Sequence, residues 1–218
     1  VIPSVLFALL IVKQPDLGTA MACCAITAAV LWVGGMHPKY LGYAAAASVL
    51  PLYWLIFRTA WRYQRILAFL DPYSDPQGRG FHMIQSLIAV GTGGFAGKGL
   101  MEGKQKLFYL PEPQTDFIYA VIAEEWGLIG SVIIVALFAF FCYRGLRCAL
   151  HTKDNFARLL AVGITAMVGV QAFFNISVVL GLLPTKGIPL PFISYGGSSL
   201  FITLASVGVL LNITKQTD

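Results

Sequence analysis

Residues 117–143 read FIYAVIAEEWGLIGSVIIVALFAFFCY, an apolar run that is long enough to cross a lipid bilayer as a helix. The polar segment LPEPQTDF, residues 110–117, leads into this run and places the carboxylate of Asp116 where the loop ends. The free N–H groups and the positive dipole at a helix start favour an acid. Asp116 is therefore predicted either to cap the helix or to belong to a reaction site at a membrane surface.

The composition of the whole chain indicates a membrane protein. It is 57% hydrophobic and 11% charged, with a mean hydropathy of +0.75, whereas about 25% of the residues of a soluble domain are charged. The apolar runs are continuous, so the sequence predicts an all-α, polytopic membrane protein. We expect five complete transmembrane helices, over residues 17–34, 40–57, 117–143, 159–183 and 190–213.

The apolar run at residues 1–12 lacks the flanks of a signal peptide, and we interpret it as part of a sixth span. Residues 1–218 are then expected to be the C-terminal part of one larger transmembrane domain. The four cysteines lie in or beside apolar spans and do not form a pair of CxxC units, so we read them as packing residues. No basic–aromatic motif of a nucleic-acid-binding protein occurs, and we expect no nucleic-acid partner.

The distribution of basic residues predicts the orientation in the membrane. Arg144, Arg147, Lys153 and Arg158 crowd the connection between the third and fourth complete spans, whereas the next connection carries only Lys186. The positive-inside rule places residues 144–158 and the C-terminus in the cytoplasm. By alternation, Lys186 and the long loop at residues 58–116 lie on the extracytoplasmic side.

The extracytoplasmic loop is predicted to contain two short helices, at residues 61–70 and 81–90. The second helix would present His82 and Gln85 about one turn apart. The basic residues of the loop, in excess over its acids and consistent with the net charge of +5, either contact lipid headgroups or gather an anionic lipid substrate.

A turn at Asp71-Pro and Asp75-Pro separates the two short helices. The glycine-rich tract at residues 91–99 follows them and is either a plain turn or backbone that approaches a ligand closely. It does not match a phosphate-binding P-loop.

Two further segments carry candidate functional residues. Residues 14–19, QPDLGT, place Asp16 at the start of a span, on the same predicted side as Asp116. Residues 183–199, LPTKGIPLPFISYGGSS, contain three prolines and the adjacent Gly196 and Gly197. They predict broken backbone at membrane depth, which requires surrounding protein or a wet cavity. The alternative is close helix packing through small residues.

Glu124 and Glu125 lie within the predicted helix that follows Asp116. Its rise places them about 12 Å deeper than Asp116, too far to share its proton. We assign them a structural hydrogen-bonding role.

Together these motifs resemble the SEDS proteins (shape, elongation, division and sporulation), the RodA/FtsW family. The resemblance rests on QPDLGTA, RILAFLDPYSDPQGRGFHMIQSLIAVGTGG, GKGL, QKLFYLPEPQTDFIYAVIAEEWGLIG and LPTKGIPLPFISYGGSS, which occur in the family's order from residue 14 to residue 199. The LPTKG form and the preceding QKLFYLPEPQTDF are more similar to the division branch, FtsW, than to the elongation branch, RodA.

The resemblance implies a peptidoglycan glycosyltransferase of about ten transmembrane helices. It would polymerise lipid II at the outer face of the bacterial cytoplasmic membrane during cell division or elongation. Through LPEPQTDF, the critical acid of the family maps onto Asp116, which could act as general base for the acceptor hydroxyl. Implied partners are membrane lipid, a class B penicillin-binding transpeptidase and other divisome proteins.

The departing diphosphate needs positive charge or a metal ion, and Lys104, Lys106, Arg79 and Lys186 are the candidate cations. No metal ligands are assigned, and a divalent cation, Mg²⁺ or Mn²⁺, is left open as a cofactor. The expected substrate-binding residues are Asp16, His82, Gln85, Lys104, Lys106, Glu112, Lys186, Ser194, Gly196 and Gly197.

Two other functions fit the same features. Broken helices and carboxylates within the membrane are also expected of a transporter, here a lipid II flippase. A non-catalytic scaffold that recruits a transpeptidase through its helices is the second alternative. Polymerisation of lipid II by the purified protein in detergent distinguishes all three.

Overall fold

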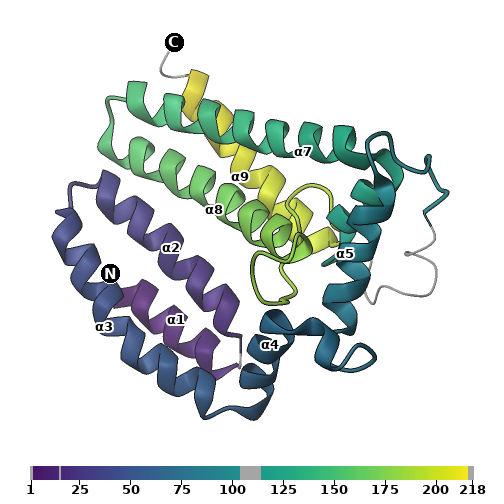
Figure 1. Ribbon diagram of the computed structural model, residues 1–218. Coiled ribbons are helices and arrows are strands. Elements are labelled where there is room, and N and C mark those ends of the chain that lie inside the picture. Colours follow the sequence, from purple (N-terminus) through teal and green to yellow (C-terminus); the bar gives the residue numbers. More distant parts are fainter. Residues whose placement is uncertain (1, 15, 104–113, 216–218) are drawn as a thin grey trace. The chain divides into compact units, whose positions relative to one another are not determined.

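The computed structural model describes residues 2–14, 16–103 and 114–215, and every regular element in these ranges is a helix. The prediction of an all-α fold is confirmed (Figure 1). The helices are α1 (Ile2–Lys13), α2 (Leu17–Val33), α3 (Pro38–Phe57), α4 (Ala60–Leu70), the 3₁₀ turn η1 (Pro72–Ser74), α5 (Phe81–Gly93), α7 (Ile118–His151), α8 (Asn155–Val179) and α9 (Gly197–Lys215).

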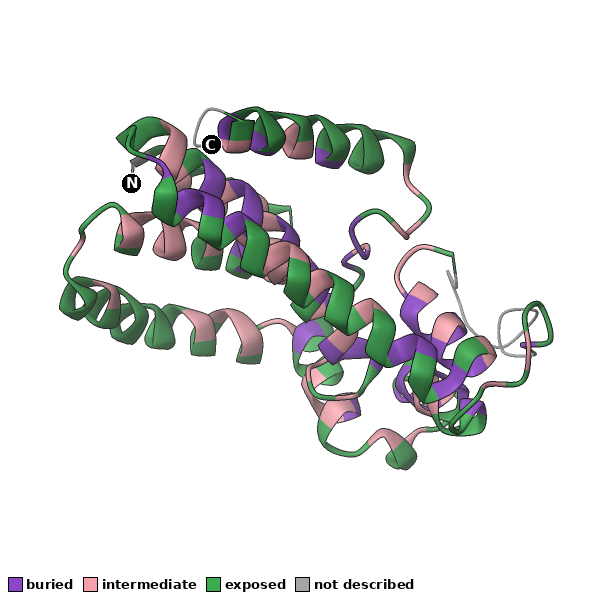
Figure 2. Ribbon diagram, turned by 90° about the horizontal axis from the view of Figure 1, so that it is seen from above, coloured by how far each residue is buried: buried purple, intermediate pink, exposed green. Residues whose placement is uncertain are grey.

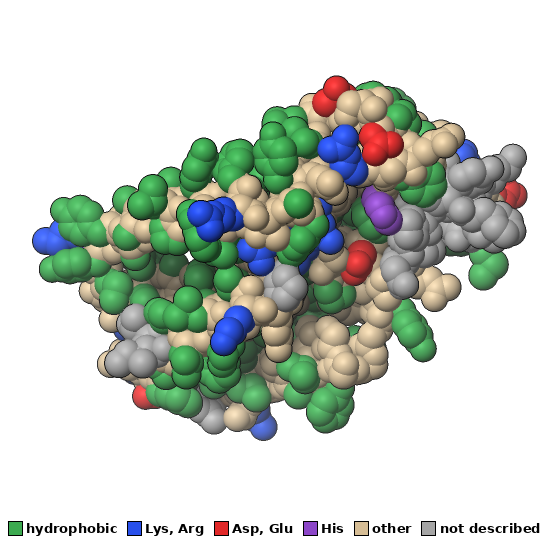
Figure 3. Space-filling model, turned by 90° about the horizontal axis from the view of Figure 1, so that it is seen from below, with side chains coloured by type: hydrophobic (Ala, Val, Ile, Leu, Met, Phe, Trp, Pro, Cys, Tyr) green, Lys and Arg blue, Asp and Glu red, His purple; other side chains and the backbone are tan. Residues whose placement is uncertain are grey.

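Four of the described helices, α3, α7, α8 and α9, are long and apolar enough to cross a membrane. The predicted span at residues 17–34 corresponds to α2, whose 17 residues make it a shorter apolar helix, as is α1. Large apolar side chains stay exposed along these helices, for example Leu50 at 78% and Phe201 at 74%. Figure 2 shows buried residues confined to limited patches, and hydrophobic side chains cover much of the face in Figure 3, as a lipid-facing surface requires.

Four predicted helix boundaries differ from the structure by four residues or more. The helix expected to end at residue 143 continues to His151, and the helix expected to begin at residue 159 begins at Asn155. The span expected at residues 159–183 ends at Val179, and the span expected to begin at residue 190 begins at Gly197. Residues 180–196 contain no helix, because Pro184, Pro189 and Pro191 cannot continue the backbone hydrogen bonding of one. This is the broken backbone that the sequence predicts for this segment.

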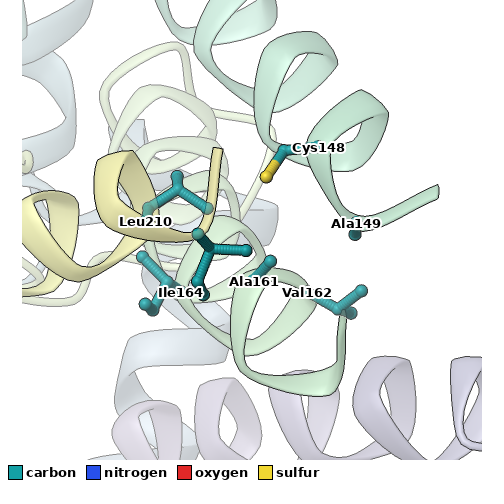
Figure 4. Packing of buried hydrophobic residues seen from close by; sticks show 7 residues of the cluster. Cys148, Ala149, Ala161, Val162, Ile164 and Leu210 are labelled. Atoms are coloured by element: carbon teal, nitrogen blue, oxygen red, sulfur yellow. The ribbon is translucent and has the colours of Figure 1, made fainter. Parts of the chain in front are cut away.

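The chain forms two compact units. The first contains residues 1–45, 137–171 and 197–218. In it, α1 packs along α2, and Cys148, Ala161 and Leu210 belong to a core shared by α7, α8 and α9 (Figure 4). Small residues allow close packing there, since a Cβ added at Gly145 of α7 would overlap the hydroxyl of Thr165 on α8.

The second unit contains residues 46–136 and 172–196. The two short helices predicted in the long loop are α4 and α5, and both contact η1, which forms the predicted turn between them. The Oγ of Ser86 on α5 donates a hydrogen bond of 2.8 Å to the carbonyl oxygen of Val179. The short helices are therefore ordered parts of this unit.

A break in α7 at Gly127 is a feature that sequence reasoning missed. Gly127 has φ 64° and ψ −156°, which interrupts the helical hydrogen bonding. The glycine-rich segment at residues 94–99 supplies replacement partners: Lys98 N donates to Glu124 O at 3.0 Å, and Leu128 N donates to Gly94 O at 2.9 Å. The close backbone approach of this tract is therefore to α7 of the same chain.

Glu124 is completely buried beside this break. One carboxylate oxygen lies 2.8 Å from Nζ of Lys98, an ion pair that fastens the glycine-rich segment to α7. Removing one partner of a buried pair leaves an uncompensated charge. This ion pair supports the structural role predicted for Glu124.

Candidate functional site

A cavity of about 540 Å³ in the second unit contains the acid singled out by the sequence. Its walls come from α4, the turn after η1, the start of α5, the residues preceding α7 and the loop that follows α8. The lining residues are Trp61, Gln64, Arg65, Asp75, Gly78, Arg79, His82, Asp116, Phe117, Thr185, Lys186 and Gly187.

Asp116 lies in a turn of residues 114–117, immediately before α7. The loop at residues 185–196 holds this turn in place by hydrogen bonds to the backbone of the turn. The Oγ of Ser194 donates to Thr115 O at 2.5 Å, and Tyr195 N donates to Gln114 O at 2.9 Å. Ser194 in turn accepts a hydrogen bond of 2.7 Å from Leu190 N, which holds its hydroxyl in place.

Asn175 joins the same two segments from α8. Its side chain is 1% exposed, and Nδ2 donates to Asp116 O at 2.8 Å and to Ile188 O at 2.7 Å. Both partners are carbonyl oxygens, so the amide must present its NH₂ group to them. Asn175 therefore fixes the backbone of Asp116 relative to the loop that carries Lys186.

Asn175→Ala is expected to lower both stability and activity, because it removes the donor from the carbonyl oxygens of Asp116 and of the buried Ile188. A buried acceptor left without a partner costs about 1–3 kcal/mol. The thermal unfolding temperature and the polymerisation rate of the complete protein measure the two effects. Asn155→Ala, at the exposed start of the same helix, is the matched control and should change neither. An unchanged rate in Asn175→Ala would remove Asn175 from the positioning of Asp116.

Gly187 packs directly against the acid. A Cβ built at Gly187 would overlap Oδ2 of Asp116, so a side chain at this position must displace the carboxylate. A glycine at this position therefore leaves room for the carboxylate where the two segments approach closely. Lys186, its neighbour in the chain, lines the same cavity.

The cavity carries three basic side chains, from Arg65, Arg79 and Lys186, and two acidic ones, from Asp75 and Asp116. Arg79 forms an exposed ion pair with Asp75, with Nε 3.5 Å from Oδ2. The hydrogen bond from the backbone N–H of Arg79 lowers the pKa of Asp75 from its ordinary value, and the N–H of Gly78 adds to this. The excess of positive charge suits an anionic ligand.

His82 stacks on Phe117, with the ring centroids 6.2 Å apart and an angle of 14° between the planes. Desolvation by burial, and then the charge of Arg65, lowers the pKa of His82 from its ordinary value of 6.5. The folded protein therefore keeps this imidazole neutral at neutral pH.

Acidification from about pH 7 to about pH 5 is expected to lower the thermal unfolding temperature in part through His82. Below pH 6.5 the unfolded chain takes up a proton at this residue before the folded chain does. The free energy of unfolding therefore decreases as the pH is lowered from 6.5 towards the pKa of His82 in the folded protein. We expect His82→Gln to reduce this fall. An identical pH dependence in the variant would contradict the role of His82.

The structure brings Asp116, His82 and Lys186 together at one cavity, and the other predicted site residues that it describes do not line this cavity. Gln85 lies on α5 but does not line the cavity, and Ser194 braces backbone. Asp16 belongs to the first unit, where it caps α2: Oδ1 accepts from Thr19 N at 3.0 Å. Lys104, Lys106 and Glu112 lie outside the described residues.

Gly196 and Gly197 precede and begin α9, respectively. A Cβ built at Gly197 meets no described atom within 4 Å, and its φ is not in the left-handed region. A close backbone approach therefore gives no reason for a glycine at residue 197 among the described residues. Within residues 183–199, the residue that has a positive φ, of 67°, is Phe192.

Sequence reasoning missed Asn175 and Gly187 as site residues. Asn175 had one signal, a polar amide inside an apolar span, which usually indicates a hydrogen-bonding role. No signal in the sequence marked Gly187 beyond its place in LPTKG, because its contact with Asp116 joins segments about 70 residues apart in the chain. In the described ranges, no group of three or more His, Cys, Asp or Glu residues could hold a metal ion.

The fold and the site define a class: a multi-pass helical membrane protein with a cavity lined by three basic and two acidic side chains. The chain belongs to the FtsW/RodA/SpoVE family of cell cycle proteins, whose profile matches residues 1–218. This confirms the resemblance seen in the motifs.

Two curated relatives of this chain are named for a glycosyltransferase activity. A probable peptidoglycan glycosyltransferase FtsW from Geobacter metallireducens is 49% identical over 216 residues, which are 99% of this chain and 57% of the relative. The peptidoglycan glycosyltransferase MrdB of Escherichia coli K12 is 42% identical over 208 residues, 94% of this chain and 56% of MrdB. The chain thus spans little more than half the length of these relatives.

A solved structure supports the fold. One chain of a structure that describes the coordination of polymerization and crosslinking by a peptidoglycan synthase complex has a TM-score of 0.76 to this chain. The two are 31% identical, and the match covers 98% of this chain and 61% of the other.

Proposed function

We propose that the complete protein is a peptidoglycan glycosyltransferase that polymerises lipid II, with Asp116 as the general base. The observation that carries the proposal is the cavity in which Asp116 and Lys186 meet Arg65 and Arg79. The names of the curated relatives and the family to which the chain belongs support the class of reaction.

In the proposed reaction, a sugar hydroxyl of the acceptor attacks the anomeric carbon of the donor. A new glycosidic C–O bond forms, the bond between that carbon and the diphosphate oxygen breaks, and the hydroxyl proton passes to Asp116. A positioned base contributes about 10²–10⁴-fold. The negative charge that develops on the departing undecaprenyl diphosphate is stabilised by the basic side chains around the cavity.

The proposal places this cavity at the outer face of the bacterial cytoplasmic membrane. Support comes from the charge bias, which puts four bases between residues 144 and 158 on the cytoplasmic side and Lys186 on the other. A membrane-bound penicillin-binding transpeptidase is the proposed partner. The structural neighbour in a peptidoglycan synthase complex, which combines polymerization with crosslinking, supports this partner.

Lys186→Gln is expected to lower kcat/KM for lipid II by about tenfold or more, because a hydrogen bond to a charged group contributes about 1.5–3 kcal/mol. The rate of glycan formation at several lipid II concentrations measures the change. Arg58→Gln is the matched control: Arg58 lies on the same predicted side but stacks 5.1 Å from the Trp54 ring and does not line the cavity. Equal effects of both variants would show that Lys186 acts only through general surface charge.

The experiment that tests the proposal is polymerisation of lipid II by the purified complete protein in detergent, with Asp116→Asn as the inactive comparison. A transporter requires a sealed bilayer, and a scaffold forms no polymer. Glycan strands in detergent that disappear in the variant are the expected result.

A further inference from the structure

A second cavity, of about 380 Å³, lies in the first unit between the C-terminal parts of α7 and α9. It shares no residue with the cavity around Asp116. The residues that line it are Phe141, Arg144, Gly145, Arg147, Cys148, His151, Val207, Leu210, Leu211 and Thr214.

One end of this cavity is basic. Arg144, Arg147 and His151 recur at intervals of three and four residues, so they share one face of α7. Among the described residues, no acidic side chain lines the cavity and neither arginine forms an ion pair. Nδ1 of His151 lies 2.8 Å from the carbonyl oxygen of Arg147, and because a carbonyl oxygen can only accept, Nδ1 is the donor in this contact.

The remaining wall is apolar. Phe141, Val207 and Leu211 form it together with Leu210, which is 6% exposed and belongs to the core shown in Figure 4. Cys148, at 7% exposure, contributes to the same wall from α7. The cavity thus joins a basic end to an apolar surface, which matches a molecule with an anionic head and a hydrocarbon tail.

We propose that this cavity binds an anionic phospholipid. The phosphodiester contacts the guanidinium groups of Arg144 and Arg147, and an acyl chain lies along Val207 and Leu211. The positive-inside rule places this end of α7 at the cytoplasmic leaflet, where anionic lipids create a negative surface potential. Basic pockets between transmembrane helices on that side are suited to lipids such as cardiolipin and phosphatidylglycerol.

The test measures binding of cardiolipin to the complete protein, purified in detergent, by native mass spectrometry. Phosphatidylethanolamine, which carries no net charge, is the comparison lipid. We expect cardiolipin to bind in preference, and Arg144→Gln/Arg147→Gln to weaken its binding by about tenfold or more. Soluble glycerol phosphate should not compete, because it lacks the tail.

The matched control is Lys39→Gln/Lys153→Gln, which removes two charges from the same predicted side without touching the cavity. It should leave cardiolipin binding unchanged. Leu211→Trp, at a residue that is 64% exposed, narrows the apolar end at constant charge and should also weaken binding.

Three results would overturn the proposal. Equal losses in the two charge variants would show general attraction to a basic surface. Full binding in both the arginine variant and Leu211→Trp would show that the lipid binds elsewhere. Displacement by glycerol phosphate would show a site for a soluble phosphate. Thermal unfolding of each variant, measured alongside, separates loss of binding from loss of fold.

Discussion

Asp116→Asn in the complete protein is expected to lower the rate of glycan polymerisation by about 10²-fold or more while the protein still folds. Asn nearly preserves the size of the side chain and caps a helix as well as Asp does. The bonds that brace the turn reach backbone atoms, at Asp116 O from Asn175 and at Thr115 O from Ser194, so the substitution leaves them in place. The amide cannot accept the acceptor's proton as a carboxylate does.

Asp75→Asn is the matched control for this substitution. It makes the same chemical change in an exposed acid on the wall of the same cavity. A loss of rate in Asp116→Asn with a small effect in Asp75→Asn identifies the base. If Asp116→Asn polymerised lipid II at nearly the original rate, the acid would serve as a helix cap and the catalytic assignment would be wrong.

Gly187→Val is expected to reduce polymerisation nearly as much as Asp116→Asn. Any Cβ at Gly187 overlaps Oδ2 of Asp116, so the carboxylate must move, although it keeps its chemistry. A displacement of about 1 Å at a reacting group can cost about 10²-fold. Because a terminal carboxylate moves more easily than backbone, we expect a smaller effect on the unfolding temperature than on the rate.

Gly91→Ala provides the comparison for Gly187→Val in the same unit, because a Cβ at Gly91 meets no described atom within 4 Å. It should leave the rate unchanged. If Gly187→Val also kept the full rate, the position of the Asp116 carboxylate in the described structure would not be the one used in the reaction.

Much of the fold could be predicted because lipid exposure leaves a direct mark on composition. Long apolar runs predicted the membrane-spanning helices, and bases and apolar residues at helical spacing predicted α4 in the loop. The break at Gly127 was not predicted, because the sequence stays apolar on both sides of it. Hydropathy carries no information about the φ angle of a residue. Its cause is a tertiary contact, the docking of residues 94–99 against α7.

The candidate site was also predicted only in part, because some of its residues carry a local signal and others depend on tertiary contacts. Asp116 stood out because an acid at the mouth of a membrane-spanning helix usually marks either a helix cap or a reaction site. The contacts of Asn175 and Gly187 with Asp116 join segments far apart in the chain, and residue types alone do not indicate which segments meet. Asp16 carried the same local signal as Asp116, but its oxygens bind Thr19, the ordinary arrangement of a helix cap.

The most direct measurement of the central claim is the formation of glycan strands from lipid II by the purified complete protein in detergent, compared with lipid II movement in sealed vesicles. The proposed mechanism predicts polymer in detergent, where no sealed compartment exists, and its loss in Asp116→Asn. Lipid II transfer across sealed bilayers without any polymer in detergent, undiminished by Asp116→Asn, would contradict it.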